Sequence, residues 1–308
     1  ASTLRGTTRP GYMTAMSNLK VVELEGRGVL AVLGEDRVAF LQGLVSNDVE
    51  RVALDRAVYS ALLTPQGKFL LDFVMASDGD RLLLECEADR LADLYKKLRV
   101  YKLRSKVELV DVSADFRSYA AFGDGVLEAL GLPDEPGAGI ACLGGLALTD
   151  PRLATMGARL ILPAASDTAS LGLEPGTEEE YDAHRIPRGV PDGARDMEVD
   201  KTVLLEAGFD ELNGVDWKKG CYMGQELTAR TKYRGLVKRR LMPITADGPM
   251  PAPGTQITKD GRDAGDIRSV QGGMAMAMIR LNMLEDGAGL LTAGDVTVTP
   301  RKPEWAEF

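Results

Sequence analysis

A cysteine between two glycines is the residue of this chain best placed to do chemistry. Cys221 stands in the stretch KKGCYMGQE, behind Lys218 and Lys219 and ahead of a helix that we expect from about Gly224 to Thr231. A helix N-terminus and nearby lysines both attract negative charge, so this setting favours the reactive thiolate form. The commoner role of a cysteine is that of a small buried side chain. We predict that Cys221 is a functional thiol.

The sequence offers Cys221 few partners. Cys86 and Cys142 lie far away along the chain, no C-x-x-C pair occurs, and His184 is the only histidine. A histidine-rich metal site or a Cys–His hydrolase is therefore hard to build, and we predict no metal site formed by this chain alone. Two roles stay open. The thiol exchanges electrons with a second thiol close in the fold, or it is one ligand of a metal or cluster that another protein completes.

Polar side chains within apolar stretches form a second group of candidates. Asp72 stands in FLLDFVM and Glu206 in LLEAGFDEL, and a buried carboxylate needs a partner. Asp72 could instead point outward by strand alternation, and Asn47 could cap a turn. The sequence contains no phosphate-binding glycine loop and no H-E-x-x-H motif.

The composition excludes several classes of protein. A formal charge of −9 and a pI of about 4.9 argue against broad binding to DNA or RNA, which needs lysine and arginine to neutralise phosphates. We expect the basic stretch KYRGLVKRR, residues 232–240, to be a solvated face. No run approaches the roughly 18 apolar residues of a membrane span.

Three separate cysteines indicate a reducing compartment, and we expect a cytoplasmic protein. Residues 1–16 carry arginines and hydroxyl groups but lack the apolar core of a secretion signal. We expect a disordered tail there. The alternative is the remnant of a targeting segment, which would place the protein in the mitochondrial matrix.

The elements expected around these residues alternate between helices and antiparallel strands, which indicates an α+β protein. LKVVELEG and GVLAVLG are expected to pair as strands, and Asp36 to Val45 has helical spacing. Apolar strands flank Thr64-Pro65-Gln66-Gly67, which fits a type I turn and predicts a hairpin. A second helix is expected over Asp89 to Leu98.

The second half of the chain repeats this alternation of helices and strands, and its last part consists of short strands. Thr177 and Glu180 predict a capping box at a helix start, and the loop RGVPDGARDMEVD that follows is of a type that often lines a site. Short strands broken by proline and glycine after Gly235 indicate a small β-barrel or sandwich. We predict two α+β subdomains, 17–112 and 113–234, and a barrel domain, 235–308.

Several segments together resemble the YgfZ-type folate-binding proteins, relatives of the glycine-cleavage T-protein (an aminomethyltransferase) and of the mitochondrial iron–sulfur assembly factor of that family. The signature is KGCYMGQE. Supporting segments occur in the expected order: FLQGLVSNDV, LLTPQGKFLLDF, YKLRSKV and HRIPRGVPD. The resemblance implies two α+β subdomains that form a folate-binding cup, followed by a β-barrel.

The resemblance also implies a cofactor and the residues that bind it. The cofactor is tetrahydrofolate or a one-carbon derivative, whose pterin N–H groups suit a carboxylate and whose anionic tail suits lysine or arginine. Glu206 is the candidate for the pterin, and Arg185, Arg230 or Lys219 for the tail. The complete set of predicted binding residues is Asn47, Arg185, Glu206, Lys219, Gly220, Tyr222, Gly224, Gln225, Glu226 and Arg230.

One departure from the T-protein affects the expected activity. At the hairpin, T-proteins have a motif similar to G-G-x-x-D-D-L. The matching residues of this chain are Gly67-Lys68-Phe69-Leu70-Leu71-Asp72-Phe73, so Leu71 stands where the motif has its first acidic residue. This puts glycine-cleavage activity in doubt and favours the YgfZ branch. Members of that branch are linked to folate-dependent maturation or repair of iron–sulfur proteins, including tRNA-thiolating enzymes.

Three functions follow as hypotheses. The first is a tetrahydrofolate-binding accessory protein for assembly or repair of iron–sulfur proteins, with iron–sulfur client or assembly proteins as partners and Cys221 as functional thiol. The second is a one-carbon transferase that uses Asp72 as acid or base. The third is a thiol-dependent redox enzyme.

Overall fold

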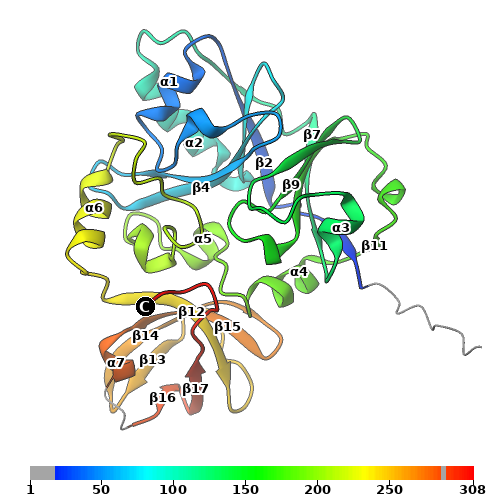
Figure 1. The fold of residues 1–308 in the computed structure, drawn as a ribbon. Helices are drawn as coiled ribbons and strands as arrows, with labels where there is room; N and C mark the ends of the chain where they lie inside the picture. Colours follow the sequence, from blue (N-terminus) through cyan, green and yellow to red (C-terminus); the bar gives the residue numbers. More distant parts are fainter. Residues whose placement is uncertain (1–17, 286–288) are drawn as a thin grey trace, which may run out of the picture.

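An antiparallel sheet of five strands forms the upper part of the computed structural model, which describes residues 18–285 and 289–308 (Figure 1). Its order is β3-β4-β5-β2-β6. The bounds are β2 Arg27–Leu33, β3 Val58–Leu63, β4 Phe69–Ser77, β5 Leu82–Glu87 and β6 Glu108–Asp111. Apolar residues of α1 (Arg37–Gln42) and α2 (Ala88–Lys102) cover one face, so both predicted helices are confirmed with shifted ends. The expectations for residues 1–16 lie outside the described residues.

The predicted hairpin between β3 and β4 is confirmed. The N–H of Gly67 donates to the carbonyl of Thr64 at 2.8 Å, and Gly67 has a φ of 84°, which favours glycine. The N–H of Thr64 donates to Lys68 O, which closes the strand ends. Because these contacts lie within five residues, local sequence was enough to predict them.

A second sheet lies beside the first and has the order β11-β1-β7-β10-β9-β8. The bounds are β1 Lys20–Glu23, β7 Phe116–Phe122, β8 Gly139–Cys142, β9 Gly145–Thr149, β10 Ala158–Pro163 and β11 Glu174–Pro175. The short helix α3 (Val126–Leu130) packs on one face. On the other face, Leu148 and Ile161 pack against Val74 and Ala76 of the first sheet, which joins the two sheets through a shared apolar layer.

The prediction that the first two strands pair with each other is wrong. Val21 of β1 pairs with Ala121 of β7 in the second sheet, whereas β2 lies between β5 and β6 in the first. A four-residue strand with two apolar residues, such as β1, would show the same pattern in either sheet, so the pattern cannot identify its neighbour. Sheet membership therefore departs from the predicted boundary at residue 112, and the three domain ranges stay predictions.

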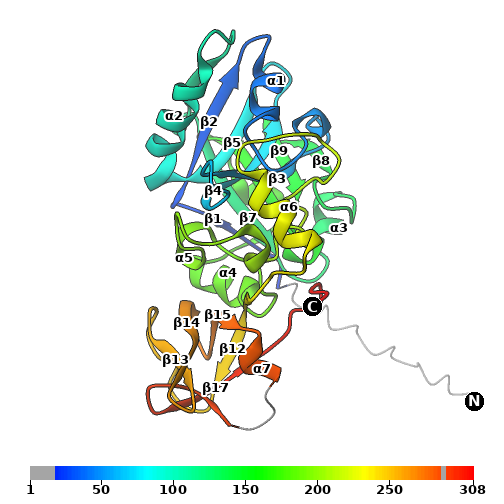
Figure 2. The ribbon, with the colours of Figure 1, turned by 90° about the vertical axis from the view of Figure 1, so that its left-hand side faces the viewer.

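Short helices connect the sheets to the C-terminal domain. They are α4 (Glu178–Arg185), α5 (Gly193–Asp196) and α6 (Gln225–Tyr233), with the 3₁₀ turn η4 (Leu204–Ala207). The other 3₁₀ turns lie between strands of the two sheets: η1 (Val49–Arg51), η2 (Ala154–Met156) and η3 (Thr168–Leu171). The capping box at Thr177 and Glu180 is confirmed, with both reciprocal hydrogen bonds. Figure 2 shows α4 and α5 between the sheets above and the barrel below, with α6 toward the viewer.

The C-terminal strands form a closed barrel in the order β12-β15-β14-β13-β16-β17, as the sequence predicted. The bounds are β12 Arg239–Ala246, β13 Gln256–Lys259, β14 Arg262–Gln271, β15 Met274–Arg280, β16 Leu291–Ala293 and β17 Val296–Pro300, with α7 at Asn282–Glu285. Ile244, Ile257 and Ile267 are fully buried inside it. The chain end then returns to the α+β part, where the Trp305 indole donates to Arg188 O at 2.6 Å.

Within residues 18–285 and 289–308, every helix is too short or too polar to cross a lipid bilayer.

Candidate functional site

The loop that carries Cys221 is fixed by hydrogen bonds on both sides of the cysteine, some within the loop and some to the end of α1. Before the cysteine, Asp216 Oδ1 accepts from the N–H groups of Lys218 and Lys219 at 2.6 and 2.9 Å. After it, the N–H of Met223 donates to Gly43 O at 3.0 Å. The loop therefore has a defined position although it contains no helix or strand before Gln225.

The side chain of Lys219 also attaches the loop to the segment after α1. Its ammonium group donates to the carbonyls of Val45 and Asn47 at 2.6 and 2.8 Å, and it lies 5.2 Å from the centroid of the Tyr222 ring. Burial lowers the pKa of Lys219 to about 8. The predicted residues Lys219, Tyr222 and Asn47 are thus brought together beside Cys221, and the charge of Lys219 is directed at backbone oxygens.

Cys221 itself is exposed, whereas Cys86 is buried and Cys142 is half-buried. The neighbouring Tyr222 is buried in the core between the first sheet and the barrel, and its N–H donates to the Gln225 side chain at 2.9 Å. The helix predicted after the motif is confirmed as α6, and its N-cap is Gly224. Burial of Tyr222 and exposure of Cys221 together present the thiol to solvent on a fixed loop.

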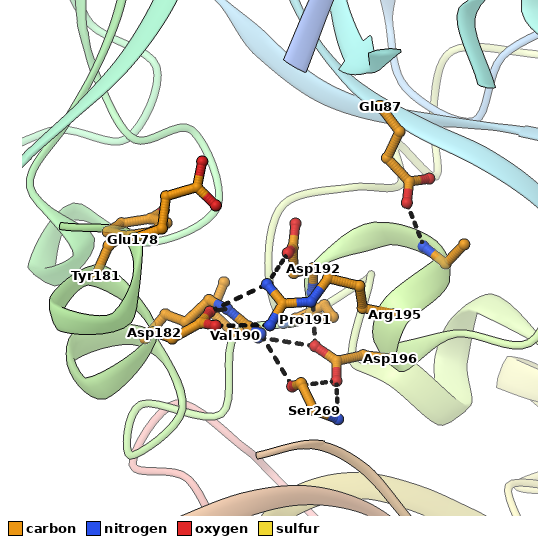
Figure 3. A network of polar contacts seen from close by, with 12 residues as sticks. Glu87, Glu178, Tyr181, Asp182, Val190, Pro191, Asp192, Arg195, Asp196 and Ser269 are labelled. Atoms are coloured by element: carbon orange, nitrogen blue, oxygen red, sulfur yellow. Dashed lines mark hydrogen bonds and ion pairs between the residues drawn. The ribbon is translucent and has the colours of Figure 1, made fainter. Parts of the chain in front are cut away.

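A second feature is a charged pocket of about 220 Å³ between the first sheet, α4 and α5, which we call the central pocket. Figure 3 shows Glu87 and Glu178 on opposite sides of it, with Asp192 and Arg195 between them. It is lined by Leu24, Gly26, Arg27, Glu87, Asp89, Arg152, Arg159, Glu178, Tyr181, Asp182, Arg185, Asp192 and Arg195. Five arginines face five acidic residues, so the pocket is polar and close to neutral.

Glu87 is one of two lining residues with a buried polar atom that has no partner among the described residues; the other is Arg159. One carboxylate oxygen accepts from the N–H of Ala194 at 3.0 Å, and the other is buried without a partner among the described residues. Burial, followed by the charge of Asp72, raises the pKa of Glu87 to about 7. At neutral pH this group can either accept a hydrogen bond from a ligand or donate one.

Asp72 lies behind the pocket and is 3% exposed, so the outward orientation considered for it does not occur. Its Oδ2 accepts from the hydroxyl of Tyr59 at 2.7 Å, while Oδ1 is buried and finds no partner in the described part of the chain. Burial raises the pKa of Asp72, although the charge of Arg27 opposes this shift. Protonation would remove the cost of burying a negative charge there, which is why burial favours the neutral acid.

Arg185 lines the pocket, but every nitrogen of its guanidinium already has a partner within the protein. It pairs with Asp182 and with Asp196, each at 2.7 Å, and donates to Ser269 Oγ on β14 at 2.9 Å. Asp196 and Ser269 also bond each other (Figure 3). Burial opposes ionisation of the nearby Asp192, but the charges of Arg185 and Arg195 outweigh it and lower the pKa of Asp192. Arg185 therefore ties α4 and α5 to the barrel.

The other predicted binding residues lie away from the central pocket. Glu206 pairs through both oxygens with Arg239 of β12, at 3.0 and 2.9 Å, and also accepts from the N–H of Val203. Glu226 and Arg230 are exposed on α6 and approach each other to 4.0 Å. Glu206 thus has a structural partner at the junction with the barrel, and its predicted contact with folate stays a prediction.

Most of the lining residues were missed by sequence analysis, among them Arg27, Glu87 and Arg152. The loop after Pro187 was the one signal that could have found part of the pocket, because it supplies Asp192 and Arg195. The described residues contain no group of three or more histidine, cysteine or acidic side chains arranged to hold a metal ion.

Comparison with known proteins identifies relatives along most of the chain. Residues 238–308 match the family model described as the CAF17 C-terminal β-barrel domain. The mitochondrial iron–sulfur cluster assembly factor IBA57 of Mus musculus is 32% identical over 309 residues, which cover 92% of this chain and 84% of the relative. The Homo sapiens protein of the same name is 33% identical, with 87% and 80% covered. These relatives are mitochondrial, so the cytoplasmic expectation gains no support from them.

The fold is also that of a structurally known enzyme. The glycine cleavage system aminomethyltransferase T from Bartonella henselae superposes with a TM-score of 0.75, and the match covers 94% of this chain and 87% of that one. Sequence identity is 16%, so the likeness concerns the fold alone. The predicted fold class, two α+β subdomains followed by a small C-terminal β-barrel, is confirmed.

Proposed function

This chain belongs to the family of the mitochondrial iron–sulfur cluster assembly factor IBA57, and we propose that it is an accessory protein for iron–sulfur cluster assembly whose Cys221 thiol contacts the cluster or its carrier. The names of the relatives indicate the process, which is iron–sulfur cluster assembly. The exposed thiol supplies the contact point, since one thiolate can complete the ligand set of a cluster held mainly by another protein.

The observation that carries this proposal is the combination of an exposed sulfur with a fixed loop. Lys219 and Met223 attach the loop to α1 and the segment that follows it, while Tyr222 is buried beside the cysteine. A ligand on a rigid support loses less entropy when it binds than one on a mobile loop. Cys86 cannot do the same because it is buried.

Replacement of Cys221 tests the assembly role. In cells that depend on this protein, Cys221→Ala should lower the activity of aconitase-type iron–sulfur enzymes under oxidative stress, while the level of the enzyme polypeptide stays constant. Cys142→Ala is the matched control, because Cys142 is half-buried on β8 and lies outside the motif. Normal iron–sulfur enzyme activity with Cys221→Ala would remove the basis of the proposal.

We further propose that the central pocket binds the pterin of tetrahydrofolate. The free oxygen of Glu87 suits a pterin N–H donor, and Arg159 has a buried Nε without a partner among the described residues, which suits an acceptor. A volume of about 220 Å³ is below the roughly 300–1,000 Å³ typical of small-molecule pockets. We therefore assign only the ring system to the pocket and expect the anionic tail to lie outside it.

Calorimetric titration with tetrahydrofolate tests this site and separates it from the original candidate. Glu87→Gln should weaken binding about tenfold or more, because it places an amide N–H against the ligand's donor. Glu206→Gln should leave affinity unchanged, since Glu206 is bound to Arg239. The reverse pattern would return the pterin contact to Glu206, and absence of binding by the unmodified protein would remove folate from the proposed function.

The two alternative functions, a one-carbon transferase and a redox enzyme, are each tested by a separate activity assay. A one-carbon transferase would turn over an aminomethyl donor and lose activity with Asp72→Asn but not with Cys221→Ala. A redox enzyme would show saturable thiol-dependent turnover without folate. The names of the relatives favour the mitochondrion over the cytoplasm as the location. The matrix as the compartment and tRNA-thiolating enzymes as clients stay predictions.

A further inference from the structure

Aromatic and basic side chains form an exposed surface beside Cys221, on α6 and on the segments at both of its ends. We call it the α6 surface and define it as Trp217, Lys218, Tyr233, Arg234, Leu236 and Lys238. Trp217 is 37% exposed and Tyr233 is 78% exposed, and their rings meet edge to face with centroids 6.2 Å apart. The same face of the molecule is turned toward the viewer in Figure 2. The surface thus joins the cysteine loop to the far end of the helix.

The apolar members of this surface are unusual in the described part of the chain. Nine large apolar side chains are exposed there, and the two aromatic ones among them, Trp217 and Tyr233, touch each other. Leu236 adds a third, 44% exposed, just after α6. Tryptophan and tyrosine are the side chains most often found at the energetic centre of protein interfaces. Single exposed leucines are ordinary, but a joined aromatic pair indicates a contact site.

The aromatic pair is also held in place. The ammonium of Lys232 lies 5.6 Å from the Trp217 ring and forms an ion pair with Asp210 at 2.7 Å. On another face of α6, Leu227 packs on Gly67 of the hairpin turn, which holds the helix against the β3–β4 turn. A partner would meet a preformed surface, which reduces the ordering cost of binding.

The charge of this region opposes the charge of the whole protein. Between Asp216 and Arg240 the chain has eight lysines and arginines and two acidic residues, whereas its net charge is −9. Lys218, Arg234 and Lys238 are exposed and form no ion pair with any residue that the structure describes. Their charges are therefore available to a partner of opposite sign.

We propose that the α6 surface docks an acidic protein, which places carboxylates against Lys218, Arg234 and Lys238 and an apolar side chain against Trp217 and Tyr233. Docking there brings the partner over Cys221, three residues from Lys218. The inference rests on the proposed function in that the partner is the protein that carries or receives the iron–sulfur species. A nucleic acid is disfavoured because the rest of the chain is strongly acidic and would repel a long polyanion.

Site-specific photocrosslinking identifies what covers this surface in cells. p-Benzoylphenylalanine replaces Tyr233 in one strain and Val100 in another, because Val100 is similarly exposed, at 68%, on α2. We expect an adduct from position 233 that exceeds the one from position 100 and that maps by mass spectrometry to an acidic segment of an iron–sulfur protein. Equal yields at both positions, a nuclease-sensitive adduct or a basic partner segment would overturn the proposal.

Charge reversal tests the same surface without a crosslinker in the docking contact. The triple variant Lys218→Glu, Arg234→Glu and Lys238→Glu should reduce the position 233 adduct about tenfold or more, since like charges would then face each other. The matched control reverses three exposed cations of α2, namely Lys96, Lys97 and Arg99, which changes the net charge equally. An equal loss of the position 233 adduct with both triple variants would show a general effect of net charge and would overturn the assignment of the α6 surface as the docking site.

Cellular iron–sulfur enzyme activity distinguishes failure of this inference from failure of the proposed function. Both Cys221→Ala and the α6 triple variant should lower the activity, and the α2 triple should not, with equal soluble levels of all variants. If Cys221→Ala lowers activity but the α6 triple does not, the docking surface is wrong and the assembly role stands. If neither lowers it, both proposals are overturned.

Discussion

The backbones of Gly67 and Gly224 lie in direct contact, one in the β3–β4 hairpin turn and the other at the start of α6. A Cβ on Gly224 would lie 3.0 Å from the Cα of Gly67 and 2.4 Å from Thr64 O, and a Cβ on Gly67 would lie 2.6 Å from Gly224 O. Both residues have positive φ, 84° and 80°. This contact joins the two most distinctive motifs of the sequence and fixes where the Cys221 loop ends and α6 begins.

We expect Gly224→Ala to be strongly destabilising. The added methyl group meets backbone on a hairpin turn that cannot move away, and the left-handed conformation adds strain, so the free energy of unfolding should fall by about 3 kcal/mol or more. Gly220→Ala is the control: Gly220 has a φ of 93° but no atom within 4 Å of its Cβ position, so only strain of about 1–2 kcal/mol applies. Chemical denaturation measures both, and equal losses would contradict the close contact.

Lys219→Met should loosen the cysteine loop without unfolding the protein. The substitution removes two charge-assisted hydrogen bonds, to Val45 O and Asn47 O, each worth about 1.5–3 kcal/mol when the acceptors stay buried. Hydrogen exchange at the amides of residues 218–223 should then accelerate at least about tenfold. Lys218→Met is the matched control, because its side chain forms no ion pair with the described residues, and similar acceleration in both variants would contradict the anchoring role of Lys219.

Arg185→Met should cost far more stability than Arg195→Met. Arg185 is 1% exposed, and its loss leaves the buried Asp196 without its cationic partner, a change worth about 3–5 kcal/mol. The Arg195 side chain is 47% exposed, and its ion pairs with Asp182 and Asp192 should contribute about 1 kcal/mol or less. Thermal or urea unfolding compares the two. A mild effect of Arg185→Met would favour its predicted role in ligand binding over the structural role described above.

Glu87→Gln should change how stability depends on pH. The pKa of Glu87 is raised from its usual 4.5 to about 7, so the folded protein holds this proton more tightly than the unfolded chain. The resulting contribution to stability is complete below about pH 4.5 and is lost as the pH rises through about 7. The variant should therefore be about 1–2 kcal/mol more stable than the unmodified protein at pH 8, a value reduced for partial solvent exposure.

Urea unfolding at pH 5 and pH 8 provides that comparison. The stabilisation should be largely absent at pH 5, where the carboxyl of Glu87 is protonated in the folded protein. The glutamine introduced by Glu87→Gln keeps a carbonyl acceptor for the Ala194 N–H, so the helix start at α5 should be unaffected. The same stability difference at both pH values would show that Glu87 does not titrate in this range.

Sequence alone was sufficient where the deciding contacts are local. The hairpin turn at Thr64 to Gly67, the capping box at Thr177 and the helix after Gly224 each depend on hydrogen bonds between residues at most four positions apart. The β-barrel was predicted because proline and glycine punctuate its short strands. Cys221 was singled out by the residues immediately around it; the structure exposes it, and its role as a functional thiol stays a prediction.

Only the tertiary structure decided which partners the polar side chains have. Glu206 is bound by Arg239, 33 residues later, and Glu87 by the Ala194 N–H, 107 residues later, so no local pattern separates the occupied carboxylate from the one with a free oxygen. The same holds for β1, which pairs with β7 instead of β2. Apolar periodicity determines which face of a strand is buried, but the neighbour of that strand, and the side chains that meet in a pocket, depend on how distant elements pack.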